Sequence, residues 1–259
     1  MKIACYPFAA GGDMEENLSH IRTGVKAAAE EGAHLACFQE CALTGYPPVE
    51  TQIESVTEEK CAAGLRAVSA LAREEGVCIL MGAVVYDGGR RYNSALVFDE
   101  KGEEICRYDK RALWGWDAEN FAPGERDGVF TLDGIKIGIR ICFDVRFPEL
   151  FRELFDDGIQ LCIMPFCDTA EHLPERRRIL TGHLRTRAAE NVMQILSVNS
   201  LSRCPAVPTA WFDQNGKIRK QINKEGLLLC DVTVPEEDFG MRGRRVNAEK
   251  FIAQRNKKP

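Results

Sequence analysis

The feature that most constrains the fold of this chain is the alternation of short apolar strands with amphipathic helices along its length. Segments such as KIACYPF, HLACFQ and QLCIMPF are typical of buried strands, and helical patterns follow them over residues 15–31, 57–75 and 173–191. Other strands form hairpins, with turn signals at residues 100–102, 133–134 and 215–216. This mixture predicts an α/β fold in which helices cover layers of sheet.

No proline-, glycine- or serine-rich linker, repeat or low-complexity tract divides the 259 residues. We therefore expect a single domain over residues 1–259. The last stretch, from about residue 235 to 259, is polar and basic enough to leave the core. We expect this C-terminal tail either to be disordered or to pack against a partner subunit.

Composition narrows the class of partner. The formal net charge is −5, and acidic and basic residues are interspersed, which argues against nucleic acid or an anionic membrane and favours a small-molecule ligand. Neither a signal peptide nor an apolar run of about 18 residues is evident, so we expect no membrane span and a cytoplasmic protein. The eleven cysteines include no Cys-x-x-Cys pair, which indicates buried thiols in a reducing compartment rather than a metal site.

The stretch IGIRICFDVRFPEL combines a strand with the start of a helix. Its isoleucines alternate as in a strand, and Pro148 and Glu149 suit the first turn of a helix. Cys142 lies between the two, at the carboxyl end of the strand. Because ligands of helix-covered sheets bind beyond the carboxyl ends of strands, Cys142 is a candidate nucleophile.

Two other strands end in residues that could serve such a nucleophile. Glu40 follows HLACFQ, and Lys110 follows EEICRYD. A carboxylate can take the thiol proton and return it to a leaving amine, and an ammonium can stabilise the oxyanion of a tetrahedral intermediate. Spacing alone leaves open a buried thiol, a helix-start carboxylate and a surface lysine, because sequence separation does not show that the three converge.

The segments around these residues carry a resemblance to a known family. FQECALTGYPP around Glu40, RYDKRALW around Lys110 and ICFDVRFPEL around Cys142 resemble, in the same order, the signature blocks of the nitrilase or carbon–nitrogen hydrolase superfamily. The similarity runs from the first strand to about Val234. It implies a four-layer α-β-β-α sandwich, with Glu40 as general base, Lys110 as stabiliser of the intermediate and Cys142 as nucleophile.

The same resemblance implies further features of the site. Glu119, just before NFAPG, would be a second glutamate that helps place substrate and water, with Asp117 as a competing match. Phe143 would contribute its backbone N–H to the oxyanion site. Relatives of this kind use no metal or organic cofactor, and they form homodimers or larger homo-oligomers through helices after the cysteine.

Other patterns depart from the family or compete with it. CDTAEHLPERRRIL replaces a small residue and a tryptophan that many relatives place near the pocket, and a glycine-serine element near VPTAWFDQNG is missing. His172 or His183 could pair with a thiol, although a structural or solvated histidine is the simpler interpretation. The arginines at 176–178 could bind a substrate carboxylate or form a solvated helix face.

The sequence therefore predicts an amidase that converts a small amide into a carboxylic acid and ammonia through a thioester on Cys142. An N-carbamoyl amide or a nitrile would use the same residues. A non-catalytic binding relative is the alternative from another class, and a redox or metal protein is a third. The acyl group of the substrate is not encoded in these motifs.

Overall fold

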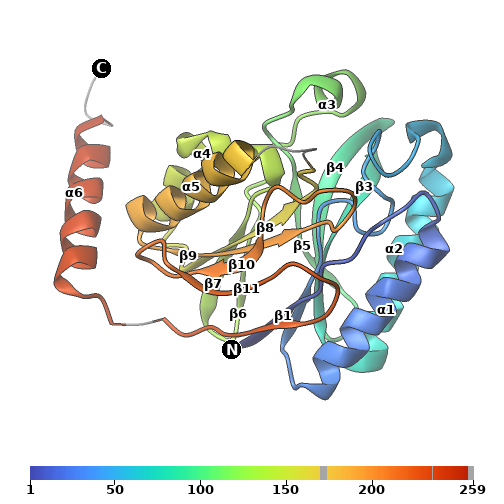
Figure 1. Ribbon diagram of the computed structural model, residues 1–259, viewed down its shortest axis with the longest axis horizontal. Coiled ribbons are helices and arrows are strands. Elements are labelled where there is room, and N and C mark those ends of the chain that lie inside the picture. Colours follow the sequence, from blue (N-terminus) through green and yellow to red (C-terminus); the bar gives the residue numbers. More distant parts are fainter. Residues whose placement is uncertain (170–173, 235, 256–259) are drawn as a thin grey trace.

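Two sheets packed face to face form the centre of the molecule, and helices cover their outer faces (Figure 1). The computed structural model describes residues 1–169, 174–234 and 236–255. The first six-stranded sheet has the order β12-β1-β2-β3-β4-β5. Its strands are β1 (Lys2–Cys5), β2 (Leu35–Cys37), β3 (Cys78–Asp87), β4 (Arg90–Phe98), β5 (Glu104–Asp109) and β12 (Leu228–Asp231).

The second six-stranded sheet has the order β11-β10-β9-β8-β7-β6. Its strands are β6 (Val129–Leu132), β7 (Ile135–Ile139), β8 (Leu161–Phe166), β9 (Gln194–Asn199), β10 (Thr209–Phe212) and β11 (Ile218–Ile222). In both sheets three neighbouring strands are parallel, β1-β2-β3 in the first and β7-β8-β9 in the second. Hairpins extend each sheet, as their turn signals predicted.

The helices divide between the two outer faces. Helices α1 (Met14–Glu30) and α2 (Glu58–Glu75) cover the first sheet, and α4 (Pro148–Asp156) and α5 (Pro174–Asn191) cover the second (Figure 1). The remaining helical elements are η1 (Ile53–Ser55), α3 (Gly115–Asn120), η2 (Cys142–Arg146) and α6 (Phe239–Arg255). This is the expected α-β-β-α sandwich. Within the described ranges, no helix is long and apolar enough to cross a membrane.

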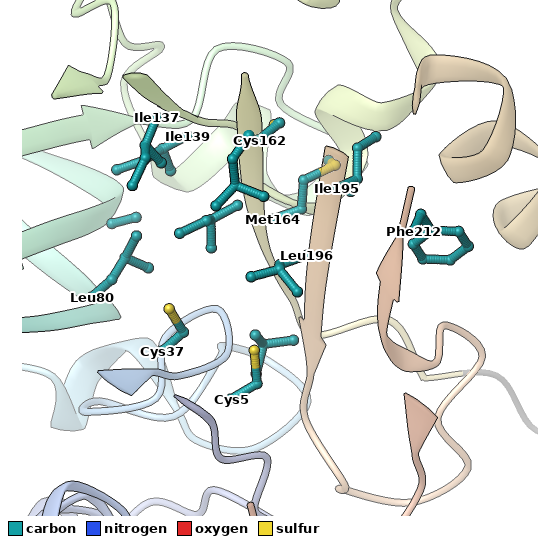
Figure 2. Close-up of a cluster of buried hydrophobic side chains, with 14 of the residues drawn as sticks. Cys5, Cys37, Leu80, Ile137, Ile139, Cys162, Met164, Ile195, Leu196 and Phe212 are labelled. Atoms are coloured by element: carbon teal, nitrogen blue, oxygen red, sulfur yellow. The ribbon is translucent and has the colours of Figure 1, made fainter. Parts of the chain in front are cut away.

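The main core lies between the two sheets (Figure 2). Cys5 and Cys37 of the first sheet belong to the same buried cluster as Ile139 and Leu196 of the second. Side chains alternate along each strand, so Ala36 faces the other way and packs with α1 and α2 in a second cluster. All of the cysteines except Cys106 and Cys204 are buried, as expected for thiols that pack as small apolar side chains.

Local signals in the sequence account for the helix starts. Asp13 caps α1, where its Oδ1 accepts a hydrogen bond of 2.9 Å from the Glu15 backbone N–H. Thr57 caps α2 in the same way, and Pro148 occupies the first turn of α4. These interactions use only neighbouring residues, and the sequence predicted the one at Pro148.

The C-terminal tail forms a helix rather than a disordered segment within the described residues. Helix α6 stands at the side of the body (Figure 1), and its Phe239 side chain is 88% exposed. It is attached at its first turns, because Met241 is buried and the Arg245 guanidinium lies 5.5 Å from the Phe155 ring centre. Packing of this tail on a partner subunit stays a proposal.

Candidate active site

The strand directions bring the three predicted site residues to one place. Strand β4 is antiparallel to both β3 and β5, so β5 runs parallel to β2 and its carboxyl end lies at the same edge of the sheet. Glu40 and Lys110 follow β2 and β5 at this edge, and the Lys110 Nζ lies 2.8 Å from the Glu40 Oε1. Cys142 joins them from the second sheet, just beyond β7, where its thiol lies close enough to Glu40 for the carboxylate to raise the pKa of the thiol.

A strained turn presents Cys142 to the site. The residue has a φ of 44°, in the left-handed region that non-glycine residues rarely adopt. The buried Asp144 stabilises this turn, because its carboxylate accepts hydrogen bonds of 2.8 Å each from the Ile141 N–H, the Tyr108 hydroxyl and the Ala112 N–H. Two of these donors flank Lys110 in the chain, so Asp144 couples the cysteine turn to the lysine segment.

Three donors fix the Glu40 carboxylate. Its Oε1 accepts from the Lys110 ammonium and from the Asn93 Nδ2, the latter at 2.7 Å. Its Oε2 accepts a 2.7 Å bond from the Cys167 backbone N–H at the end of β8. The Glu40 backbone also crosses β3 closely, since a Cβ on Gly82 would lie 2.3 Å from the Cys41 nitrogen. The Glu40 carboxylate is therefore held by both sheets.

Lys110 binds a second carboxylate, which belongs to Asp117. The Lys110 Nζ lies 2.7 Å from the Asp117 Oδ2, and the Tyr46 hydroxyl donates a 2.7 Å bond to the Asp117 Oδ1. The Trp114 Nε1 donates in turn to the Tyr46 oxygen at 2.5 Å. The lysine is thus oriented between two buried acidic groups.

Glu119 does not take the position that the family resemblance implied for it. The structure leaves Glu119 exposed on α3, whereas Asp117 is 0% exposed and contacts the lysine. Successive helical residues are rotated by about 100°, so positions two apart point to nearly opposite sides of the helix. Only one of the two acidic side chains can face the site, and that one is Asp117.

The electrostatics of the buried groups depend on one another. Burial raises the pKa of the Cys142 thiol well above its ordinary value, and the charge of Glu40 adds to this while Lys110 opposes it. Burial would lower the pKa of Lys110, but the charges of Glu40 and Asp117, and that of Cys142 whenever it ionises, raise it well above its ordinary value. At rest the thiol therefore keeps its proton and the lysine stays charged.

A cavity of about 270 Å³ opens onto the cysteine. Its lining residues come from both sheets and their connecting segments: Tyr46, Val49, Trp114, Cys142, Phe143, Arg146, Cys167, Asp168, Thr169 and Arg176. Phe143 thus lies beside Cys142, with its ring centre 5.5 Å from that of Phe147. A volume of this size suits a small ligand.

Two arginines add charge to the cavity wall. Arg176 binds the buried Asp168 through two hydrogen bonds, of 2.9 Å from Nε and 2.8 Å from a terminal nitrogen. The Arg146 guanidinium lies 5.5 Å from the Phe143 ring centre, and no carboxylate of the described residues pairs with it. Of the arginines at 176–178, the first reaches the cavity and the other two are exposed.

The competing candidate His183 lies elsewhere. His183 is half-buried on α5, and burial together with Arg187 and Arg146 lowers its pKa, but it does not line the cavity at Cys142. His172 lies outside the described residues. Within the described ranges, no group of three or more His, Cys, Asp or Glu side chains is arranged to hold a metal ion.

Comparison with known proteins relates this geometry to a family. The model of the family "Carbon-nitrogen hydrolase" matches residues 3–238. The mouse omega-amidase NIT2 is 25% identical over 238 residues, which cover 84% of this chain and 83% of that protein. A Pseudomonas protegens protein described as a hydrolase in the pqqF 5′ region is 31% identical over 170 residues, and this match spans 58% of its length.

Solved structures give the same result for the fold. An amidase from Nesterenkonia sp. superposes with a TM-score of 0.83 at 26% identity, over 97% of this chain and 96% of that one. A mutant of the same amidase superposes with a TM-score of 0.86 at 25% identity, over 100% and 97% of the two chains. That structure contains the acetamide moiety of fluoroacetamide covalently added to its active-site cysteine.

Proposed function

Since the chain belongs to the carbon–nitrogen hydrolase family and is a hydrolase of amide C–N bonds, we propose that it converts a small primary amide into a carboxylic acid and ammonia through a thioester on Cys142. The observation that carries this proposal is the convergence of a buried thiol, carboxylate and ammonium, of which the thiol of Cys142 lines a small cavity and the other two lie behind it. Each group alone has an ordinary structural explanation. Together they supply a nucleophile, a base and a cation.

In the first step, Glu40 accepts the thiol proton as the sulfur attacks the amide carbonyl carbon. A thiol with a raised pKa needs such a base, because little thiolate exists beforehand. The C–S bond forms and the carbonyl π electrons move to oxygen. The Lys110 ammonium and the Phe143 backbone N–H then stabilise the oxyanion.

In the second step, Glu40 returns the proton to the departing nitrogen. The C–N bond breaks, ammonia leaves, and the acyl group remains on sulfur as a thioester. Glu40 next accepts a proton from a water molecule that attacks the thioester carbonyl. Collapse of this second intermediate releases the carboxylic acid and gives the proton back to the Cys142 sulfur. Asp117 supports both steps by orienting Lys110.

The charge of the cavity favours an amide whose acyl group ends in a carboxylate. Arg146 offers a guanidinium that no described carboxylate occupies, and guanidinium binds carboxylate through paired hydrogen bonds. Similarity to omega-amidases supports an amide as the substrate. An N-carbamoyl amide and a nitrile remain alternatives, because the same nucleophile can attack their electrophilic carbon.

Ammonia release tests the proposal directly. We expect release from primary amides, and more rapid release from those with a terminal carboxylate, while N-carbamoyl compounds and nitriles define the alternatives. The Cys142→Ala variant should be inactive, and Cys204→Ala, which removes an exposed thiol, should retain full activity. Ammonia release that persists in Cys142→Ala would exclude the thioester mechanism. A Cys142 no more reactive toward alkylating agents than other thiols would favour a non-catalytic binding protein.

We also propose that the chain acts as a homodimer or larger homo-oligomer. Helix α6 exposes Phe239, Val246 and Phe251. Contact with a second subunit would remove these apolar side chains from water. Light scattering on the full chain and on a variant with Phe251→Glu tests this assignment. A cytoplasmic location, expected from the buried free thiols, is tested by cell fractionation.

A further inference from the structure

The side chain of Glu50 closes a turn beside the active site. The turn runs from Tyr46 to Glu50, whose backbone N–H donates a 2.8 Å bond to the Tyr46 carbonyl. The Glu50 Oε2 accepts a second 2.8 Å bond, from the Tyr46 N–H. Its Oε1 accepts from the hydroxyls of Ser200 and Ser202, which follow β9. One carboxylate therefore fixes the turn internally and ties it to the second sheet.

This turn forms one wall of the cavity. Tyr46 and Val49 line the space in front of Cys142, whereas Glu50 is not among its lining residues. The Tyr46 hydroxyl binds Asp117, and the Tyr46 ring centre lies 5.6 Å from the Lys110 Nζ. Any displacement of the turn would therefore move a wall of the pocket and a partner of the Lys110–Asp117 pair.

Glu50 is also connected to the base through the end of β8. The Cys167 thiol lies close enough to Glu50 to lower the pKa of its carboxyl, while the Cys167 backbone N–H donates to the Glu40 Oε2 at 2.7 Å. Cys167 thus lies between the two glutamates. In the described part of the chain no lysine, arginine or histidine forms an ion pair with Glu50, so its carboxylate is held by hydroxyl and amide donors.

We propose that Glu50 is a positioning residue. Its ionised carboxylate holds the cavity wall at Tyr46 and the end of β8 at Cys167, and through them it keeps Glu40 in the geometry that Cys142 needs to react. This inference rests on the proposed function, because the proposed function assigns Glu40 as the base. Glu50 itself touches no reacting atom. It acts through residues that contact the cavity and the base.

The contacts of Glu50 make this role dependent on its ionisation. Burial raises the pKa of the Glu50 carboxyl, and its hydrogen-bond donors oppose that shift only in part. The titratable side chains around it are Tyr46, Cys41 and Cys167, and none of them is cationic. Protonation would turn one acceptor oxygen into a donor and leave a hydroxyl or amide hydrogen without its partner.

The Glu50→Gln variant tests the inference, because it keeps the shape and removes the charge. The exposed Glu54 provides the matched control, Glu54→Gln. The first readout is the rate at which iodoacetamide alkylates Cys142. Peptide mass spectrometry measures this rate at a series of pH values. The second is kcat and KM for ammonia release. Both report on the site, and the first requires no turnover.

We expect Glu50→Gln to lower the alkylation rate and kcat/KM about tenfold at neutral and alkaline pH, with a raised KM as the pocket wall shifts. The difference from the wild-type protein should disappear at acidic pH, where the wild-type Glu50 is itself protonated. Glu54→Gln should match the wild type throughout. A Glu50→Gln effect that is the same at every pH would overturn the inference, since a purely structural role predicts that result. Wild-type behaviour of Glu50→Gln would overturn it as well.

The Ser202→Ala variant decides the question should Glu50→Gln fail to fold. It removes one donor to the carboxylate and should raise the Glu50 pKa further, which moves the acidic loss of alkylation to higher pH. An unshifted profile in a folded Ser202→Ala protein would refute the role of Glu50. Ammonia release by Cys142→Ala would instead refute the proposed function, so the two failures are distinguishable.

Discussion

Neutralising Asp117 should damage catalysis, while the same change at Glu119 should have no effect. The Asp117→Asn and Glu119→Gln variants each replace a carboxylate with its amide, at positions two residues apart on α3. Asp117 is 0% exposed and binds the Lys110 ammonium at 2.7 Å, whereas Glu119 is exposed. The pair therefore tests which of two acidic residues in the same motif belongs to the site.

The size of the effect follows from the two hydrogen bonds of Asp117. An asparagine would turn its oxygen toward Lys110 and its NH₂ toward Tyr46, whose oxygen already accepts from Trp114. A hydrogen bond to a charged group contributes about 1.5–3 kcal/mol, so a loss of about 2 kcal/mol is expected, or roughly thirtyfold in kcat/KM. Removal of the negative charge should also lower the pKa of Lys110, because Asp117 helps to raise it.

Steady-state kinetics of ammonia release across pH provide the assay. The loss in Asp117→Asn should be largest at neutral pH and should shrink in acid, because burial raises the pKa of Asp117 and the wild-type carboxyl is then also neutral. The alkaline decline in activity should move to lower pH as Lys110 loses its proton more easily. Thermal unfolding checks that both variants fold. Equal losses of kcat/KM in Asp117→Asn and Glu119→Gln, or no loss in either variant, would refute the role of Asp117 in orienting Lys110.

Other substitutions test separate parts of the structure. Gly82→Ala should strongly destabilise the fold in thermal unfolding, because its Cβ would lie 2.3 Å from a backbone nitrogen, whereas Gly182→Ala in α5 meets nothing within 4 Å and should stabilise by about 0.5–1 kcal/mol. Tyr108→Phe removes one donor to Asp144 and should lower kcat while leaving KM unchanged. Denaturant unfolding should show a loss of about 1–3 kcal/mol in the free energy of unfolding. Arg146→Met should raise KM for carboxylate-bearing amides about tenfold or more and leave neutral amides nearly unaffected; equal changes for both would contradict a carboxylate-binding role.

Features that depend on neighbouring residues were determined by the sequence. The proline at the start of α4 and the hairpin turns act within a few residues, so their patterns predicted the elements that formed. The alternation of strands and helices indicated layers of sheet covered by helices. The motif blocks around Glu40, Lys110 and Cys142 added the sandwich itself through resemblance, and the comparisons confirm that family.

The surroundings of the three predicted residues were decided by the tertiary structure. Asn93 binds Glu40 only because β4 pairs beside β3, and the Cys167 N–H reaches the same carboxylate from the other sheet. The local sequence shows only that a polar residue, Asn93, precedes the apolar part of β4. It does not indicate that the Asn93 side chain binds Glu40. The helical phase of α3 likewise selected Asp117 over Glu119, although both fit the motif.

The other differences between the sequence-based predictions and the structure also arise from tertiary packing. Arg176 turned out to line the cavity, bound to Asp168, although its two neighbours are exposed as a solvated helix face would be. The polar tail became helix α6, which contacts the body at Met241 and Arg245. Local sequence sets backbone preference and burial pattern, but contacts between residues far apart in the chain depend on how the two sheets pack, and that packing decided which side chains complete the site.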